Sequence, residues 1–214
     1  MEKFTQLTSV AIPLDMDNLD TDQLMPKQFL HGIDKSGLDK GLFYNLRFTS
    51  DGEKNPACVF NKPGFEAAQI IVAGPNFGCG SSREHAVWGL MQYGIRVVIA
   101  PGFGEIFYSN CFNNGLLAAR EADSRRLFVA VSSDMPKRLT VNLKDQTITA
   151  EDGTVVNFTV APRHKTMLAE GLDMIDATLK DLPAIEAFRA EHEKAFPWMT
   201  GLPGQWNRNR ATNK

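Results

Sequence analysis

The chain has 214 residues, of which 43% are apolar and 22% charged, and its formal net charge is −2 at pH 7. This length and apolar content suffice for one hydrophobic core, with at most a small appended subdomain. Charges of both signs are mixed along the chain, so no basic face of the kind that binds nucleic acid or an anionic membrane is expected.

The N-terminal segment shows no signal-peptide pattern and leads into a predicted strand. Residues 1–6 lack the apolar core of a signal peptide, and no run in the sequence approaches the roughly 18 apolar residues of a membrane span. Residues 5–14 predict a strand that ends at Pro13. We therefore expect a soluble, cytoplasmic protein.

An acid-rich stretch follows at residues 15–22, with four aspartates among eight residues. A calcium loop of the EF-hand type would need a glycine and a terminal glutamate at fixed offsets, and both are missing. Turns and helix caps are the predicted roles of these carboxylates.

Residues 26–64 show no sustained periodicity, and the interruptions include Gly32, Gly37, Gly41, Gly52 and Pro56. A segment of that length inside a compact domain is usually a lid or a binding loop, or else it is mobile. We predict a long irregular loop over residues 27–57, and the sequence does not decide whether it is ordered without a partner.

From residue 68 onwards the pattern becomes regular. It predicts a strand over 68–73, a glycine-rich loop, a helix over 82–93 and a strand over 96–100, which is the alternation of an α/β unit. A turn at 101–104 and a second short helix over 105–112 follow, and that helix ends at the Asn-Asn-Gly sequence of residues 113–115.

The C-terminal part is predicted to contain a strand, a hairpin and helices. Residues 127–131 are continuously apolar and predict a strand, and residues 138–160 alternate around the turn sequence Glu-Asp-Gly-Thr at 151–154. Residues 163–196 predict helix, with Pro183 near a helix start. The boundaries expected are a single domain over residues 1–200 and a flexible tail over 201–214.

The greatest concentration of reactive side chains is the octet Gly-Cys-Gly-Ser-Ser-Arg-Glu-His at residues 78–85. It lies between a predicted strand and a predicted helix, so the polar cluster is expected at a helix N-terminus. There the first N–H groups lack intrahelical partners and the helix dipole adds about half a positive charge, which stabilises a carboxylate, a phosphate or an oxyanion. The plainer alternative is a serine N-cap followed by a solvated arginine–glutamate pair.

Three chemical roles compete for this octet. Nucleotide binding is disfavoured because the spacing does not match G-x-G-x-x-G and no Walker lysine follows. A nucleophile elbow is disfavoured because G-x-S-x-G is absent. In a carboxylate site, Arg83 would make a bidentate bond to a substrate carboxylate and Ser81 would lie in a nest of N–H donors that stabilises its alkoxide. Those donors would have to lower the pKa of the serine hydroxyl by many units.

The three cysteines, Cys58, Cys79 and Cys111, do not form a metal or disulfide motif. They are widely spaced, without a Cys-x-x-Cys or Cys/His pairing, so free thiols in a reduced compartment are expected. Iron–sulfur motifs usually place at least two cysteines within a few residues, and here every gap exceeds twenty residues. No metal or cofactor is therefore expected on this chain.

Several segments resemble one known family. Residues 78–86, Gly-x-Gly-Ser-Ser-Arg-Glu-His-Ala, resemble the signature of the swivelling domain of the aconitase superfamily. Residues 17–30, Asp-Asn-Leu-Asp-Thr-Asp-Gln-Leu-Met-Pro-Lys-Gln-Phe-Leu, resemble the N-terminal signature of the small subunits of 3-isopropylmalate dehydratase. Residues 103–117 are similar to the next helix and turn of that family, and residues 188–199 to the C-terminus of its bacterial members.

The resemblance covers roughly residues 3–199. One departure is the pair Ala118 and Ala119, where the family often has a proline, and it affects no catalytic residue. The fold implied is α/β, a β/β/α three-layer swivelling domain of the aconitase type with a C-terminal helical extension.

The activity that the resemblance implies is a reversible dehydration and rehydration in leucine biosynthesis. It interconverts 2-isopropylmalate and 3-isopropylmalate through 2-isopropylmaleate, and a [4Fe-4S] cluster on a separate large subunit acts as Lewis acid. The active site is then expected at a heterodimer interface. A related hydro-lyase acting on homoaconitate, citraconate or dimethylmalate, or a non-catalytic carboxylate-binding module, remains as an alternative.

The resemblance also assigns roles to individual residues. Ser81 would be the general base, and Ser82 and Arg83 would bind the substrate carboxylate, although spacing alone does not decide which of the two serines is the base. Orienting roles fall to Gly78, Gly80, Glu84 and His85. Substrate side-chain recognition falls to Leu30 and His31.

Overall fold

The structure is a computed structural model that describes residues 1–30, 35–121, 124–133 and 135–199. The chain divides into two compact units, Met1–Asp173 and Met174–Lys214. The predicted boundaries, a single domain over 1–200 and a tail over 201–214, stay predictions. Among the described residues, no helix is both long enough and apolar enough to span a bilayer.

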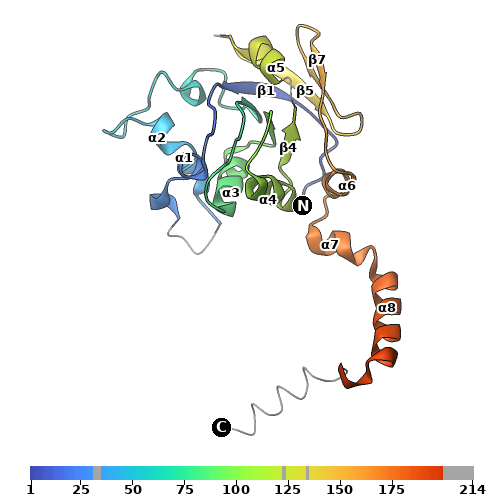
Figure 1. The fold of residues 1–214 in the computed structure, drawn as a ribbon. Helices are drawn as coiled ribbons and strands as arrows, with labels where there is room; N and C mark the ends of the chain where they lie inside the picture. Colours follow the sequence, from blue (N-terminus) through green and yellow to red (C-terminus); the bar gives the residue numbers. More distant parts are fainter. Residues whose placement is uncertain (31–34, 122–123, 134, 200–214) are drawn as a thin grey trace, which may run out of the picture. The chain divides into compact units, whose positions relative to one another are not determined.

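The first unit is built on one seven-stranded mixed sheet with the strand order β4-β3-β2-β1-β5-β6-β7 (Figure 1). Strands β1 to β4 pair in parallel, and β5, β6 and β7 continue the sheet in antiparallel pairs from the other side of β1. The strands are β1 (Gln6–Leu14), β2 (Ile70–Ala73), β3 (Val97–Ala100), β4 (Leu117–Arg120), β5 (Lys137–Asn142), β6 (Thr147–Ala150) and β7 (Val155–Asn157).

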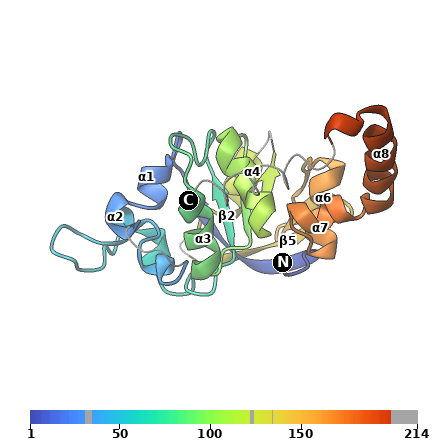
Figure 2. The same cartoon turned by 90° about the horizontal axis from the view of Figure 1, so that it is seen from below.

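Helices cover both faces of this sheet. Helices α3 and α4 lie side by side on one face, and α5 packs on the other face against β1 and β2 (Figures 1 and 2). The helices of the first unit are α1 (Thr21–Leu24), α2 (Tyr44–Arg47), α3 (Glu84–Tyr93), α4 (Glu105–Asn114), α5 (Ser124–Val131) and α6 (Pro162–Glu170). The predicted α/β fold in three layers is confirmed.

The strands β2 and β3 are buried along their whole length, because both of their faces are covered. Their side chains are almost all β-branched, which suits a pleated and fully packed surface. The residues predicted to form a strand, a glycine-rich loop and a helix therefore fold as predicted, although α3 begins at Glu84 rather than at residue 82.

The prediction of a strand over residues 127–131 is wrong, since these residues belong to α5. Buried positions in α5 are Ser124, Leu127 and Val131, which are three and four residues apart, as on one face of a helix. Val129 points away from the sheet and is 65% exposed. A short apolar run is compatible with either a strand or a buried helix. The spacing of the buried residues distinguishes the two, but it is known only from the structure.

The irregular segment over residues 27–57 contains short helical turns rather than extended loop. It includes the 3-10 turn Lys27–Phe29, the 3-10 turn Leu38–Lys40 and α2. Phe43 anchors the segment, because its ring is completely buried and lies 4.7 Å from the ring of Phe60.

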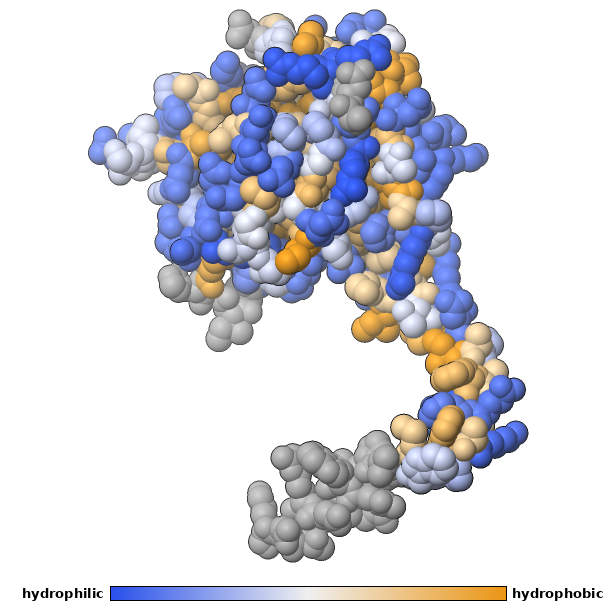
Figure 3. Space-filling view, viewed as in Figure 1, coloured by the Kyte–Doolittle hydropathy of each residue, from blue (hydrophilic) through white to orange (hydrophobic). Residues whose placement is uncertain are grey.

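The second unit is helical, as predicted for the C-terminal extension, with α7 (Met174–Leu179) and α8 (Leu182–Ala195). None of its described residues is buried. Apolar side chains are exposed on it (Figure 3), among them Ile175 and Phe188.

Candidate active site

The loops that follow β1, β2 and β3 meet at the carboxyl-terminal edge of the parallel strands. In open α/β sheets this edge is where ligands bind. Phe77, in the loop after β2, accepts a backbone hydrogen bond from Gly104 (2.9 Å) and donates one to Gly102 (3.0 Å) in the loop after β3. The glycine-rich loop is therefore fixed on one side.

The acid-rich stretch after β1 fixes the other side of the glycine-rich loop. Gly78 donates its N–H to the Leu19 carbonyl over 2.7 Å, and Thr21 donates its N–H to the Cys79 carbonyl over 3.0 Å. The Thr21 hydroxyl also donates to the Ser81 carbonyl over 3.0 Å. The loop that carries the predicted base is thus held by main-chain bonds from both neighbouring loops.

Two glycines make this close approach of three loops feasible. Gly78 has a φ of +72°, and a Cβ there would lie 2.3 Å from the Phe107 ring. A Cβ on Gly104 would lie 2.4 Å from the Gly78 carbonyl oxygen. Both contacts are shorter than side-chain carbons tolerate, so each position requires glycine. An orienting role for Gly78 remains a proposal, and its steric requirement gives that proposal a physical basis.

The two serines of the octet precede α3 and are exposed. Arg83 is the N-cap residue of α3, so Ser81 and Ser82 lie just beyond the end of the helix where its N–H groups lack intrahelical partners. Neither serine hydroxyl is hydrogen-bonded to another described residue. Both hydroxyls are therefore accessible to a ligand or to a docked chain.

Arg83 forms an ion pair with Asp22, which lies in the first turn of α1. The Arg83 side chain is 15% exposed and that of Asp22 is 43% exposed. The hydrogen bond from the Arg83 guanidinium holds the pKa of Asp22 below its usual value. A substrate carboxylate that binds Arg83 would have to share or displace this aspartate.

Asp22 is a site residue that the sequence interpretation missed. The signal available for it was the Asp-Thr-Asp sequence at residues 20–22. Asp20 is the N-cap of α1, and its side chain accepts a hydrogen bond from the Gln23 N–H over 2.8 Å, which confirms the predicted capping role. The next two residues, Thr21 and Asp22, are thereby left pointing at the glycine-rich loop.

Replacing Asp22 with asparagine is expected to lower stability only above acidic pH. Because the folded-state pKa is depressed, the stabilisation is complete above the unfolded-state pKa and disappears as the pH falls through the folded-state pKa. A partly exposed pair contributes up to about 1 kcal/mol. The melting temperature of Asp22→Asn should therefore lie up to about 4 °C below that of the wild type at pH 7.

The same comparison at pH 3 tests the cause. The difference between the two melting temperatures should shrink there, because pH 3 lies below the unfolded-state pKa of aspartate and the stabilisation from the ion pair is being lost. Asp51→Asn, at an exposed loop position, is the matched control and should change neither value. A gap that persists undiminished at pH 3 would contradict the ion-pair explanation.

Glu84 and His85 face the packing between α3 and α4. Asn114 donates to the Glu84 carboxylate over 2.7 Å and accepts from the Trp88 indole N–H over 2.9 Å. The His85 ring lies 4.8 Å from the ring of Trp88. These contacts fix the first turn of α3, which supports the orienting role proposed for both residues.

Leu30 and His31 are the two residues predicted to recognise the substrate side chain. Leu30 follows the 3-10 turn Lys27–Phe29 and packs, partly buried, against the hydrophobic core. His31 lies outside the described residues. Gly80, predicted as an orienting residue, has a φ of +87°, and a Cβ there would lie 3.4 Å from Asp20.

The cysteines do not gather at the site. Burial raises the pKa of the Cys111 thiol well above its usual value and also raises that of Cys58. Cys79 donates its thiol to the Asn18 carbonyl over 3.3 Å. Within the part of the chain that the structure describes, no group of three or more His, Cys, Asp or Glu side chains could hold a metal ion.

Comparisons with known proteins agree on one family. The family model of the aconitase C-terminal domain matches residues 1–123. The 3-isopropylmalate dehydratase small subunit 1 of Chromobacterium violaceum is 52% identical over 200 residues, which cover 92% of this chain and 94% of that protein. The 3-isopropylmalate dehydratase small subunit of Afipia carboxidovorans is 48% identical, over 93% of this chain and 100% of that protein.

A solved structure supports the same fold. The crystal structure of 3-isopropylmalate dehydratase from Methanocaldococcus jannaschii aligns with a TM-score of 0.63 at 23% identity, over 86% of this chain and 99% of that chain. Sequence relatives, family model and fold therefore coincide. The chain belongs to the aconitase C-terminal domain family and, within it, to the small subunits of 3-isopropylmalate dehydratase.

Proposed function

We propose that this chain is the small subunit of a cytoplasmic 3-isopropylmalate dehydratase, which interconverts 2-isopropylmalate and 3-isopropylmalate through 2-isopropylmaleate. The observation that carries the proposal is the pair of exposed serines in front of α3, next to Arg83, in a chain 52% identical to a named small subunit. The reaction requires a base to remove a proton, a guanidinium to bind a carboxylate, and a group that stabilises negative charge, such as a helix N-terminus. All three lie close together in sequence at residues 81–84.

In the proposed mechanism, the Ser81 alkoxide removes the proton from the carbon next to a substrate carboxylate, and the electron pair of that C–H bond forms the double bond. The hydroxyl on the neighbouring carbon departs and takes up a proton from solvent to become water. Arg83 holds that carboxylate through two parallel N–H···O bonds. Rehydration adds one water in the other orientation, with the proton returned to one carbon and the hydroxyl added to the other. The two isomers differ only in which carbon receives the hydroxyl.

Ser81 cannot act as a base on its own, because a serine hydroxyl is almost completely protonated at neutral pH. The α3 N-terminus favours the alkoxide through its N–H groups and its dipole. The remaining stabilisation would come from groups that approach the exposed hydroxyl when a second chain docks. This requirement supports an active site completed at a subunit interface.

The expected [4Fe-4S] cluster belongs to the large subunit in this proposal, since the described residues of this chain offer no set of metal ligands. When bound there, the cluster supplies Lewis acidity toward the departing hydroxyl. Leu30 and His31 are proposed to lie near the isopropyl group of the substrate, where an apolar wall discriminates by about 1 to 3 kcal/mol per methylene.

The test is to assay this chain with and without its large subunit. We expect no turnover of 2-isopropylmalate by the chain alone, and formation of 3-isopropylmalate once the large subunit is added. Homoaconitate, citraconate and dimethylmalate serve as competing substrates. If any of them is turned over better than 3-isopropylmalate, the assignment passes to that hydro-lyase. Dicarboxylate binding without turnover by the assembled pair would favour a non-catalytic module.

A further inference from the structure

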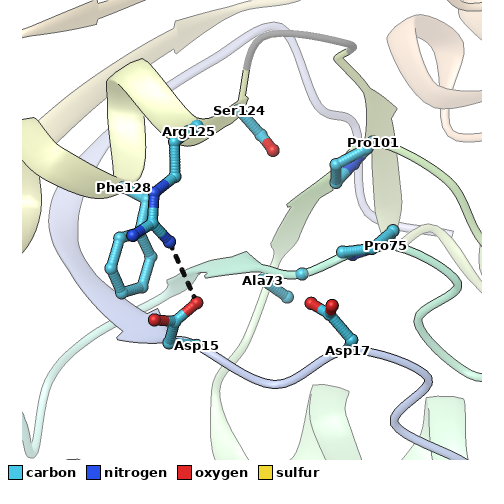
Figure 4. Close-up of a pocket in the computed structure, with 9 residues that line it drawn as sticks. Asp15, Asp17, Ala73, Pro75, Pro101, Ser124, Arg125 and Phe128 are labelled. Carbon is cyan, nitrogen blue, oxygen red and sulfur yellow. Dashed lines mark hydrogen bonds and ion pairs between the residues drawn. The ribbon is translucent and has the colours of Figure 1, made fainter.

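A cavity lies beside the glycine-rich loop, and the mechanism above does not use it. Its volume is about 190 Å³, and it opens where β1, β2 and β3 end, under the first turn of α5 (Figure 4). One water molecule occupies about 30 Å³ of liquid volume. The cavity therefore has room for the head group of a side chain.

The charges that line the cavity leave one carboxylate without a partner. Asp15 is paired with the Arg125 guanidinium at 3.1 Å, and that guanidinium also lies over the Phe128 ring, 5.0 Å from its centre. Asp17 makes no hydrogen bond or ion pair with another described residue. Even with about half a positive charge from the α5 N-terminus, the lining stays negative.

The absence of a side chain at Gly74 leaves room for the Asp17 carboxylate. A Cβ on Gly74 would lie 2.5 Å from an Asp17 carboxylate oxygen, so only a glycine leaves room for this carboxylate. Its carboxylate points into the cavity (Figure 4). Asp17 therefore presents a negative charge to the cavity.

Ser124 gives a second, independent sign that the cavity is built for a polar group. Its side chain is only 4% exposed, yet its hydroxyl is not hydrogen-bonded to any described residue. The hydroxyl points into the cavity from the opposite wall (Figure 4). Because no described residue partners it, this hydroxyl is free to bond a polar group that enters the cavity.

The cavity is continuous with the edge that carries the catalytic serines. Pro75, which lines the cavity, accepts a backbone hydrogen bond from Asn18 over 2.9 Å. The Asn18 carbonyl in turn accepts a hydrogen bond from the Cys79 thiol over 3.3 Å. Cys79 lies two residues before Ser81. The cavity and the loop that carries Ser81 are thus linked through Asn18, so a chain that docks at this edge of the sheet can reach both.

We propose that this cavity is a socket for a basic side chain, a lysine or an arginine, of the large subunit. The inference rests on the proposed function, because that function requires a second chain over the serines. Asp17 pairs with the incoming cation, and Ser124 accepts one of its N–H bonds. The socket fixes the register in which the large subunit docks on the catalytic loop.

The test is the dissociation constant of the two full-length subunits, measured by biolayer interferometry at low and at high salt. Asp17→Asn should weaken association about ten- to a hundredfold at low salt, because it leaves the incoming cation unpaired. Asp17→Glu should retain most of the affinity, and Ser124→Ala should weaken association less than Asp17→Asn. The salt dependence of Asp17→Asn should be flatter than that of the wild type.

Glu151→Gln is the matched control, since it removes one exposed carboxylate at the turn between β6 and β7. Thermal melts should show all four variants folded. The socket is refuted if Asp17→Asn binds the large subunit within twofold of Glu151→Gln at low salt. A free organic amine could occupy the cavity in the same way as a lysine side chain, and n-butylammonium is the probe for it. If n-butylammonium raises the melting temperature of the isolated wild-type chain and Asp17→Asn leaves association unaffected, the cavity binds a free cation. The docking proposal then fails.

The outcome is separable from that of the proposed function. If no large subunit binds and activates the wild-type chain, the proposed function itself is wrong. If the wild-type pair is active and Asp17→Asn binds normally, only the socket is wrong.

Discussion

Replacing Ser81 with alanine is expected to lower kcat of the assembled enzyme by about 10²- to 10⁴-fold, the usual contribution of a positioned general base. Alanine keeps the backbone and removes only the hydroxyl. The loop should hold its shape, because Gly78, Cys79 and the Ser81 carbonyl are bound through main-chain atoms. The measurement is turnover of 2-isopropylmalate at saturating large subunit, with the dissociation constant of the subunits determined alongside.

Ser82→Ala is the comparison that assigns the base. Both serines are exposed in front of α3, so their substitutions should perturb the fold equally little. We expect Ser82→Ala to raise KM more than it lowers kcat, as for a residue that binds a carboxylate. If Ser82→Ala loses kcat and Ser81→Ala keeps it, the two roles must be exchanged. Near-normal turnover in both variants would remove serine from the mechanism.

The parallel half of the sheet was predictable because its local signals agree with each other. Strand β2, the glycine-rich turn and α3 each have a distinct pattern, and Gly94 ends α3 with a φ of +106° where the periodicity stops. Strand β4 was not predicted. Its sequence Leu-Ala-Ala-Arg has weak strand propensity, and it becomes a strand by pairing with β3, where Val98 faces Ala118.

The site was predictable only in the part that is local in sequence. The octet at residues 78–85 can be recognised from its residue types alone. Its partner Asp22 is 61 residues from Arg83, and the pairing depends on how the loop after β1 lies against the loop after β2. A parallel bridge between Asp20 and Cys79 sets that arrangement. Only the tertiary fold reveals such a contact.

The cavity beside the site escaped the sequence interpretation for the same reason. Ser124 lies in the segment next to residues 127–131, which were predicted as a strand, and a strand would not bring its hydroxyl over the end of β2. The helical form of α5 does so, with Arg125 beside Asp15. Because residues 127–131 were predicted as a strand, the sequence did not place Ser124 and Arg125 near Asp17.

Replacing Arg83 with lysine is expected to raise KM for 2-isopropylmalate about ten- to a hundredfold, while kcat changes less. Lysine keeps the positive charge but lacks the planar fork that bonds both oxygens of a carboxylate. A hydrogen bond to a charged group contributes about 1.5 to 3 kcal/mol, and its loss corresponds to that change in KM. Steady-state kinetics of the assembled enzyme provide the measurement.

The matched control is Arg96→Lys. Arg96 is similarly covered, 19% exposed against 15% for Arg83, and it also pairs with one carboxylate, that of Glu2. It lies before β3, at the opposite edge of the sheet from the serines. Its substitution should therefore leave KM unchanged. If Arg83→Lys likewise leaves KM unchanged, Arg83 does not bind the substrate, and its ion pair with Asp22 serves only to hold α1 against the glycine-rich loop.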